Sequence, residues 1–116
     1  MKYILLIYAQ EAGWNQLTPE QQKQGVAAYS AYTEALNAAG VSIASDRLRP
    51  IATATSVRIV NGETKVLDGP YAESKEQLGG FYMIDVPDLD TALSWAARCP
   101  GAAYGTIEVR PIWEMY

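Results

Sequence analysis

The run Tyr3-Ile4-Leu5-Leu6-Ile7-Tyr8 decides the fold, because every one of its positions is apolar. Such a run, short and rich in branched and aromatic residues, predicts a β-strand. Side chains alternate across a strand, so the odd-numbered residues share one face and the even-numbered residues share the other. Both faces of this strand are therefore apolar, and both need a cover.

A long helix is predicted next, from Pro19 to Ala39. Thr18 is placed to cap its first turn, and Gln21 completes a capping box three residues later. Gly40 supplies the residue type that most often ends a helix. The segment Ala9–Leu17 in front of the cap is polar and is expected to be irregular.

The remaining pattern adds three strands, a hairpin and a second helix, each bounded by turn residues. Asn-Gly is a strong hairpin signal, because both central positions of a tight turn favour a positive φ. The predicted elements are a strand at Val41–Ala44, a hairpin of Ser56–Val60 and Thr64–Leu67 around Asn61-Gly62, a strand at Phe81–Val86, a helix capped by Asp88 with Leu89, Ala92, Leu93 and Ala96 inward, and a last strand at about Thr106–Trp113.

This order predicts one α+β domain over residues 1–116, with a ferredoxin-like split βαβ arrangement, an antiparallel sheet and an inserted hairpin. Two helices cover only one face of such a sheet. The strands Tyr3–Tyr8 and Phe81–Val86 are apolar on both faces, so a monomer would leave an apolar face wet. A face-to-face homodimer removes that face from water, and a loop folding back over it is the alternative.

Composition excludes several classes of function. The chain of 116 residues has a net charge of −4 and scattered basic residues, which argues against nucleic acid and anionic membranes as partners. No segment is long and apolar enough for a membrane span, so we expect a cytoplasmic protein. Histidine is absent and Cys99 is the only cysteine, which removes imidazole catalysis and cysteine-based zinc sites. We expect no metal and no bound cofactor, and a buried, unreactive Cys99.

The stretch from Asp68-Gly69-Pro70-Tyr71 to Gly79-Gly80-Phe81-Tyr82 resembles the signature of the YCII-related family, in the branch named for its Asp-Gly-Pro-Phe tetrapeptide. The opening strand, the run Thr53–Arg58 and the helix Leu89–Arg98 resemble that family as well. The departure within the tetrapeptide is Tyr71, where the branch has Phe. The resemblance implies a dimeric α+β barrel and no general reaction. Other members are proposed to use a His–Asp pair, which this chain cannot form.

The loop after the hairpin is the first candidate site. Asp68 stands where a strand ends. It serves either as a turn cap bonded to nearby backbone amides or as a carboxylate that binds a ligand or takes part in catalysis. Glu73, Lys75 and Glu76 follow it and form either part of a pocket or a solvated charged face, and Tyr71 is a candidate lining residue.

Three residues outside this loop complete the candidate ligand-binding set. Arg47 could bind a carboxylate or phosphate, although such arginines more often pair with surface acids. Tyr8 and Trp14 flank the segment after the first strand and form either an aromatic wall or ordinary packing. On the last strand, Glu108 and Arg110 share a face and are expected to form a cross-strand ion pair.

Three functional classes follow. The first is a protein that binds a small polar or aromatic metabolite near the dimer interface and works without a cofactor if it is an enzyme. The second is a non-catalytic sensor or accessory protein linked to transcriptional regulation, a role suggested by family context. The third is an oligomerisation scaffold.

Overall fold

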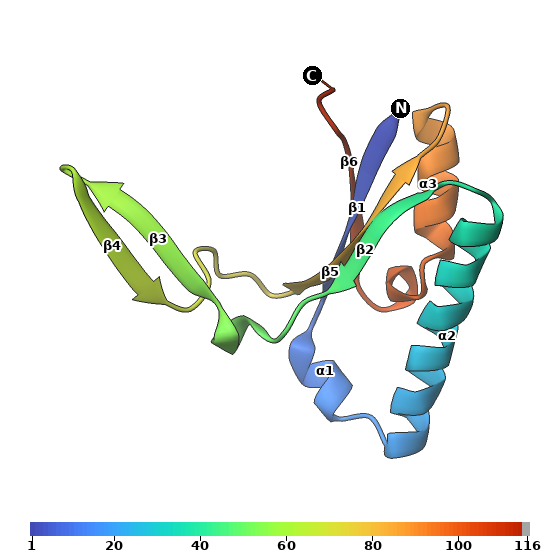
Figure 1. The fold of residues 1–116 in the computed structure, drawn as a ribbon. Helices are drawn as coiled ribbons and strands as arrows, with labels where there is room; N and C mark the ends of the chain where they lie inside the picture. Colours follow the sequence, from blue (N-terminus) through green and yellow to red (C-terminus); the bar gives the residue numbers. More distant parts are fainter. Residues whose placement is uncertain (115–116) are drawn as a thin grey trace.

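A computed structural model describes residues 1–114 and confirms the ferredoxin-like prediction. Four strands form an antiparallel sheet in the order β2-β5-β1-β6 (Figure 1). The first strand, β1, therefore lies inside the sheet, between β5 and β6. The elements of this body are β1 (Lys2–Ala9), α1 (Glu11–Asn15), α2 (Pro19–Ala38), β2 (Ser42–Arg47), β5 (Gln77–Asp85), α3 (Leu89–Arg98), the 3-10 turn η2 (Pro100–Ala103) and β6 (Thr106–Pro111).

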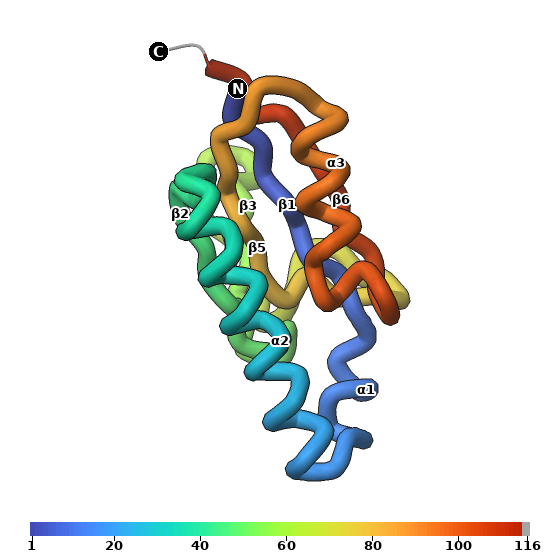
Figure 2. Tube along the Cα trace, turned by 90° about the vertical axis from the view of Figure 1, so that its right-hand side faces the viewer, coloured from blue at the N-terminus to red at the C-terminus, as the bar shows by residue number. Residues whose placement is uncertain are grey.

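Helices α2 and α3 lie on the same face of this sheet, which we call the helix-covered face (Figure 2). The core forms between them and the sheet, where Leu5, Leu36 and Ile84 are completely buried. Tyr32 of α2 meets the edge of the Tyr82 ring with the ring centres 5.1 Å apart. The odd-numbered residues of β1 face this core, as the alternation predicts.

The opposite side of the sheet, which we call the open face, has no helix over it among the described residues (Figure 1). The even-numbered residues of β1 point to it, and their pairing with β5 puts Phe81 and Met83 beside Leu6 and Ile4. These side chains are half-buried, whereas Tyr3, Leu5, Tyr82 and Ile84 beside them along the strands are buried. The sheet therefore has one apolar face that the described chain covers and one that it covers poorly.

The capping box of α2 is confirmed: the Thr18 hydroxyl accepts the Gln21 amide, and the Gln21 side chain accepts the Thr18 amide. Gly40 follows the helix with a φ of +73°. The irregular segment predicted before it contains the short helix α1. This helix is missed by the sequence pattern because it is held by contacts to distant residues and carries no cap of its own.

The second helix and two strands also differ from the prediction. Leu89 and Leu93 are exposed, and the buried residues of α3 are Ala92 and Ala96, with Trp95 packed against the core beside them. The predicted strands near residues 41 and 81 are longer in the structure, extending to Arg47 and back to Gln77. The last strand ends before Trp113, which is 84% exposed.

The predicted hairpin is confirmed, and it forms a separate two-stranded sheet. Strands β3 (Thr55–Val60) and β4 (Glu63–Asp68) pair around Asn61 and Gly62, whose φ values are +51° and +79°. The hairpin, which we call the arm, extends away from the body (Figure 1). The 3-10 turn η1 (Ile51–Thr53) leads into it from β2.

Candidate functional site

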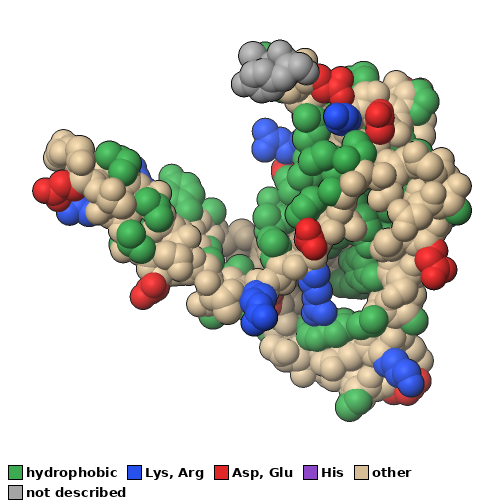
Figure 3. Space-filling model, in the orientation of Figure 1, with side chains coloured by type: hydrophobic (Ala, Val, Ile, Leu, Met, Phe, Trp, Pro, Cys, Tyr) green, Lys and Arg blue, Asp and Glu red, His purple; other side chains and the backbone are tan. Residues whose placement is uncertain are grey.

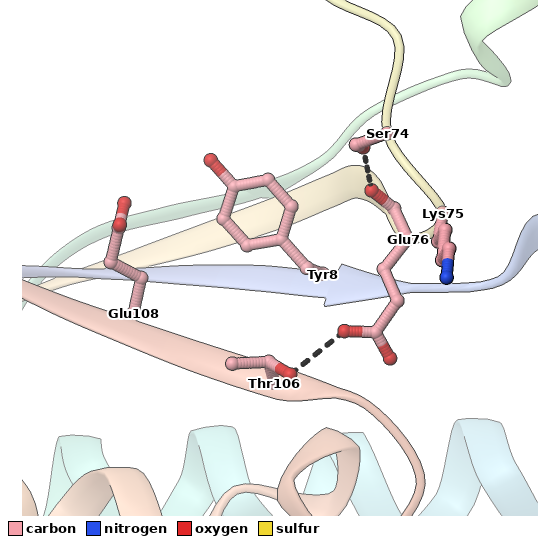
Figure 4. A pocket seen from close by; sticks show the side chains of 6 residues that line it. All are labelled: Tyr8, Ser74, Lys75, Glu76, Thr106 and Glu108. Atoms are coloured by element: carbon pink, nitrogen blue, oxygen red, sulfur yellow. Dashed lines mark hydrogen bonds between the residues drawn. The ribbon is translucent and has the colours of Figure 1, made fainter.

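A groove of about 300 Å³ lies at the edge of the open face, where β1, β6 and the segment before β5 meet (Figure 4). Its lining residues carry polar or aromatic side chains, and they come from two strands and a loop that are far apart in sequence. The residues that line it are Tyr8, Ser74, Lys75, Glu76, Thr106 and Glu108.

Antiparallel pairing of β1 and β6 builds one side of the groove. Tyr8 is the register partner of Thr106, and Leu6 is the partner of Glu108. Partners in a sheet share a face, so the Tyr8 ring and the Glu108 carboxylate project to the same side (Figure 4). Within residues 1–114 neither Glu108 nor Arg110 makes an ion pair, so the cross-strand ion pair expected from sequence is not observed.

The segment Ser74–Glu76 forms the other side. The Thr106 hydroxyl donates to a Glu76 carboxylate oxygen at 2.7 Å, and the Ser74 hydroxyl donates to the Glu76 backbone carbonyl. The Gln77 side chain then donates to the Ser74 carbonyl at 2.9 Å and accepts the Glu11 amide at 3.0 Å. This chain of bonds fixes the segment against β6 and α1.

The groove brings together a phenol, an ammonium group, two carboxylates and two hydroxyl groups. Glu76 is already bonded to Thr106, so Glu108 and Lys75 are the charged groups left to meet a ligand. An aromatic ring beside hydrogen-bonding groups suits a small ring compound with polar substituents. Over the described residues, no three acidic or cysteine side chains lie close enough to hold a metal ion.

Trp14 and Arg47 lie elsewhere, on the helix-covered side of the sheet. The Arg47 guanidinium carbon is 4.9 Å from the centre of the Trp14 ring, a cation–π distance. The far edge of the same ring is 3.1 Å from where a β-carbon on Gly25 of α2 would stand. Trp14 therefore fills the space between α2 and β2, in keeping with the packing alternative.

The remaining predicted residues, Asp68, Tyr71 and Glu73, are exposed in the connection between the arm and the groove. The Asp68 side chain makes no hydrogen bond to another described residue, so the turn-cap interpretation is not supported. Instead, the Gly69 amide donates to the Ala54 carbonyl at 2.7 Å, and the Ser56 hydroxyl donates to the Gly69 carbonyl at 2.8 Å. Backbone groups close this turn, and Gly69 permits it at a φ of +106°.

Of the seven predicted residues, the structure brings only Tyr8 and Lys75 into the groove. Ser74 and Thr106 are the lining residues that sequence reasoning missed. Glu76 was considered with Glu73 and Lys75 as part of a pocket or of a solvated face, and Glu108 was expected only in an ion pair. Their proximity depends on how β1 and β6 pair. The alternation of the last strand puts Glu108 on a polar face, but nothing local to it indicates a neighbour such as Tyr8.

Burial changes the ionisation of four groups in the core. It raises the pKa of Tyr29, Tyr32 and Tyr82 above the ordinary phenol value, and it raises the pKa of the Cys99 thiol. Tyr32 donates to the Trp95 carbonyl at 2.7 Å. These groups stay protonated near neutral pH and serve packing. The prediction of a buried Cys99 is confirmed, since it is 2% exposed.

A sheet in the order β2-β5-β1-β6 with two helices on one face defines a ferredoxin-like α+β domain. The chain belongs to the YCII-related family, because the family model described as the YCII-related domain matches residues 1–116. A protein of Rhizobium meliloti (strain 1021) described as uncharacterized protein R00369 is 39% identical over 114 residues, covering 97% of this chain and 92% of that protein.

The fold is also similar to a solved structure. It is that of 5-chloro-2-hydroxyhydroquinone dehydrochlorinase (TftG) from Burkholderia phenoliruptrix AC1100, in complex with 2,5-dihydroxybenzoquinone. The TM-score is 0.56 at 15% identity, over 97% of this chain and 94% of that one. At this identity the likeness concerns the fold. No helix among the described residues is long and apolar enough to cross a membrane.

Proposed function

We propose that this protein is a homodimer that binds a small polar aromatic metabolite in the groove between Tyr8 and Glu108. One observation carries the proposal: the groove lies at the edge of the open face, next to the apolar side chains of β1 and β5. A second copy packed on that face would stand beside the groove and help to exclude water from it.

The chemistry of the groove supports a ring ligand with hydroxyl or carbonyl substituents. The Tyr8 ring offers a stacking surface, the Glu108 carboxylate accepts hydrogen bonds from hydroxyl groups, and the Lys75 ammonium attracts an anionic oxygen. The ligand of the dehydrochlorinase with a similar fold, 2,5-dihydroxybenzoquinone, belongs to this chemical class. The same likeness supports a version of the proposal in which the protein is a cofactor-independent enzyme. Such an enzyme would work without a His–Asp pair, since the chain has no histidine. The finer assignment to the Asp-Gly-Pro-Phe branch rests on Asp68–Tyr71 and stays a prediction.

Thermal shift with 2,5-dihydroxybenzoquinone and a series of hydroxylated benzenes tests the ligand. A compound that binds the folded state raises the melting temperature with concentration. We expect Glu108→Gln to reduce this shift and Glu34→Gln, an exposed change on α2, to leave it intact. Equal shifts in both variants would show that the compound does not bind in the groove. Consumption of the bound compound would indicate an enzyme, and binding without turnover a sensor.

Light scattering tests the dimer. We expect a mass of two chains at micromolar concentration, and a lower mass after Leu6→Lys, because that substitution puts a charge in the open face. A wild-type mass of one chain would contradict the dimer and leave the ligand test unaffected.

A further inference from the structure

The arm formed by β3 and β4 carries more exposed apolar surface than its size explains. Five of its large apolar side chains are between 43% and 66% exposed, namely Val57, Ile59, Val60, Val66 and Leu67. An isolated two-stranded hairpin is only marginally stable in water. The arm therefore needs a surface to pack on.

The two faces of the arm differ. Val57 lies opposite Val66 and Ile59 lies opposite Thr64, so this face is apolar. On the other face Arg58 lies opposite Lys65, and Lys65 forms an ion pair with Glu63 at 2.9 Å. This face carries Val60 and Leu67 near its two ends, with the charged side chains between them. The charged face suits water, and the face of Val57, Ile59 and Val66 is the one that gains from burial.

The arm is held away from its own body. The Ile51 amide at its entry donates to the Glu11 carboxylate of α1 at 3.0 Å, which ties the base of the arm to the body. The Gly69 amide donates to the Ala54 carbonyl at 2.7 Å and closes that base. The described chain has a radius of gyration of 16.2 Å, against about 13 Å for a compact domain of this length. Hydrophobic side chains lie on the arm and on the part of the sheet opposite it, with open space between them (Figure 3).

We propose that the arm clasps a second copy of this chain, with the face of Val57, Ile59 and Val66 packed on the partner. The inference rests on the homodimer proposed above and adds to it a separate structural element. In a two-fold dimer each arm covers the other subunit, so both arms and both open faces are buried in one closed contact.

The area that a stable dimer must bury supports a second copy of this chain as the partner of the arm. One face of the four-stranded sheet covers roughly 450 Å², from its strand spacing and rise per residue. A standard stable interface buries about 800 Å² on each partner, so the sheet alone falls short. One arm face adds roughly 200 Å² by the same geometry. The surface beneath the partner's arm adds a similar area, so the area buried on each subunit reaches roughly the standard size.

A pair of matched substitutions tests the clasp. Val57→Glu puts a charge on the apolar face of the arm, and Val26→Glu makes the same change on α2, where Val26 is 51% exposed and Val57 is 60% exposed. Neither residue is in the buried core, so circular dichroism should show a folded body in both variants. Sedimentation equilibrium should give a dimer dissociation constant at least tenfold higher for Val57→Glu and unchanged for Val26→Glu.

The outcomes separate the two proposals. A wild-type dimer that Val57→Glu does not weaken, or that both substitutions weaken equally, overturns the clasp and leaves the dimer standing. A monomeric wild type overturns both. Amide hydrogen exchange gives a second measurement: protection of Thr55–Val60 and Glu63–Asp68 should rise with protein concentration, and concentration-independent protection would contradict the clasp.

Discussion

The Arg47 guanidinium lies over the Trp14 ring at 4.9 Å, and the opposite contact of that ring is with Gly25 of α2. The indole is thus held between a strand and a helix by one charged and one backbone neighbour. The carbonyl of Trp14 also accepts the Gln22 side chain at 3.0 Å. Through these contacts Trp14 fixes α1 against α2 and β2, while Glu11 of the same helix bonds to Gln77 and Ile51.

Gly25→Ala should change stability differently with and without Trp14. Alanine favours a helix over glycine by about 1 kcal/mol, but its β-carbon would stand 3.1 Å from the indole. We expect a nearly unchanged free energy of unfolding in the wild type and a gain of about 1 kcal/mol in a Trp14→Ala background. Urea unfolding of the four proteins measures the coupling, and an equal effect in both backgrounds would show that the ring does not restrict position 25.

The elements that could be predicted are those set by neighbouring residues. The cap at Thr18 and the turn at Asn61-Gly62 depend on side chains and backbone angles within a few positions, so the sequence identifies them. The helix α1 depends on Gln77, which is 66 residues from Glu11. The direction of the arm depends on the bond from Ile51 to Glu11, 40 residues apart. Local patterns carry no information on either contact.

The candidate site divides in the same way. Tyr8 and Lys75 are polar or aromatic residues next to a strand end, which sequence reasoning can select. Their grouping with Thr106 and Glu108 follows from the pairing of β1 with β6. Arg47 belongs to the other face because of its register with β5, and Trp14 of α1 packs against it there. Residue type therefore indicates candidate site residues, and the register between strands determines which of them lie together.

Stability should fall in alkaline solution, and Tyr29 should account for part of the loss. Burial raises the pKa of Tyr29 in the folded protein above the ordinary phenol value, which the unfolded chain retains. A group whose pKa is raised in the folded state stabilises the protein below a pH of about 10. This stabilisation is lost as the pH rises further. We expect the melting temperature of Tyr29→Phe to depend less steeply on pH above that point. Parallel curves for both proteins would contradict this assignment.

Asp68 should matter less to stability than the backbone around it. Its exposed side chain bonds to no other described residue, so Asp68→Ala should change the free energy of unfolding by less than about 0.5 kcal/mol. Gly69 has a φ of +106°, so Gly69→Ala should cost about 1–3 kcal/mol or detach the base of the arm. Urea unfolding with exchange measurements on the arm compares them. A larger loss from Asp68→Ala would restore its role as a cap.

Glu11 should control the arm through a hydrogen bond that no sequence pattern reveals. Its carboxylate accepts the Ile51 amide with both oxygens, at 3.0 and 3.3 Å, and its own amide donates to Gln77. Glu11→Ala leaves the Ile51 amide without this acceptor and should cost about 1–3 kcal/mol, while Glu11→Gln keeps a neutral acceptor and should cost less. Exchange of the Ile51 amide should accelerate in the order wild type, Glu11→Gln, Glu11→Ala. If the clasp is correct, dimer dissociation should follow the same order, because a loosened base no longer directs the arm toward the partner. Accelerated exchange at Ile51 with unchanged dissociation would show that the arm finds its position without this anchor.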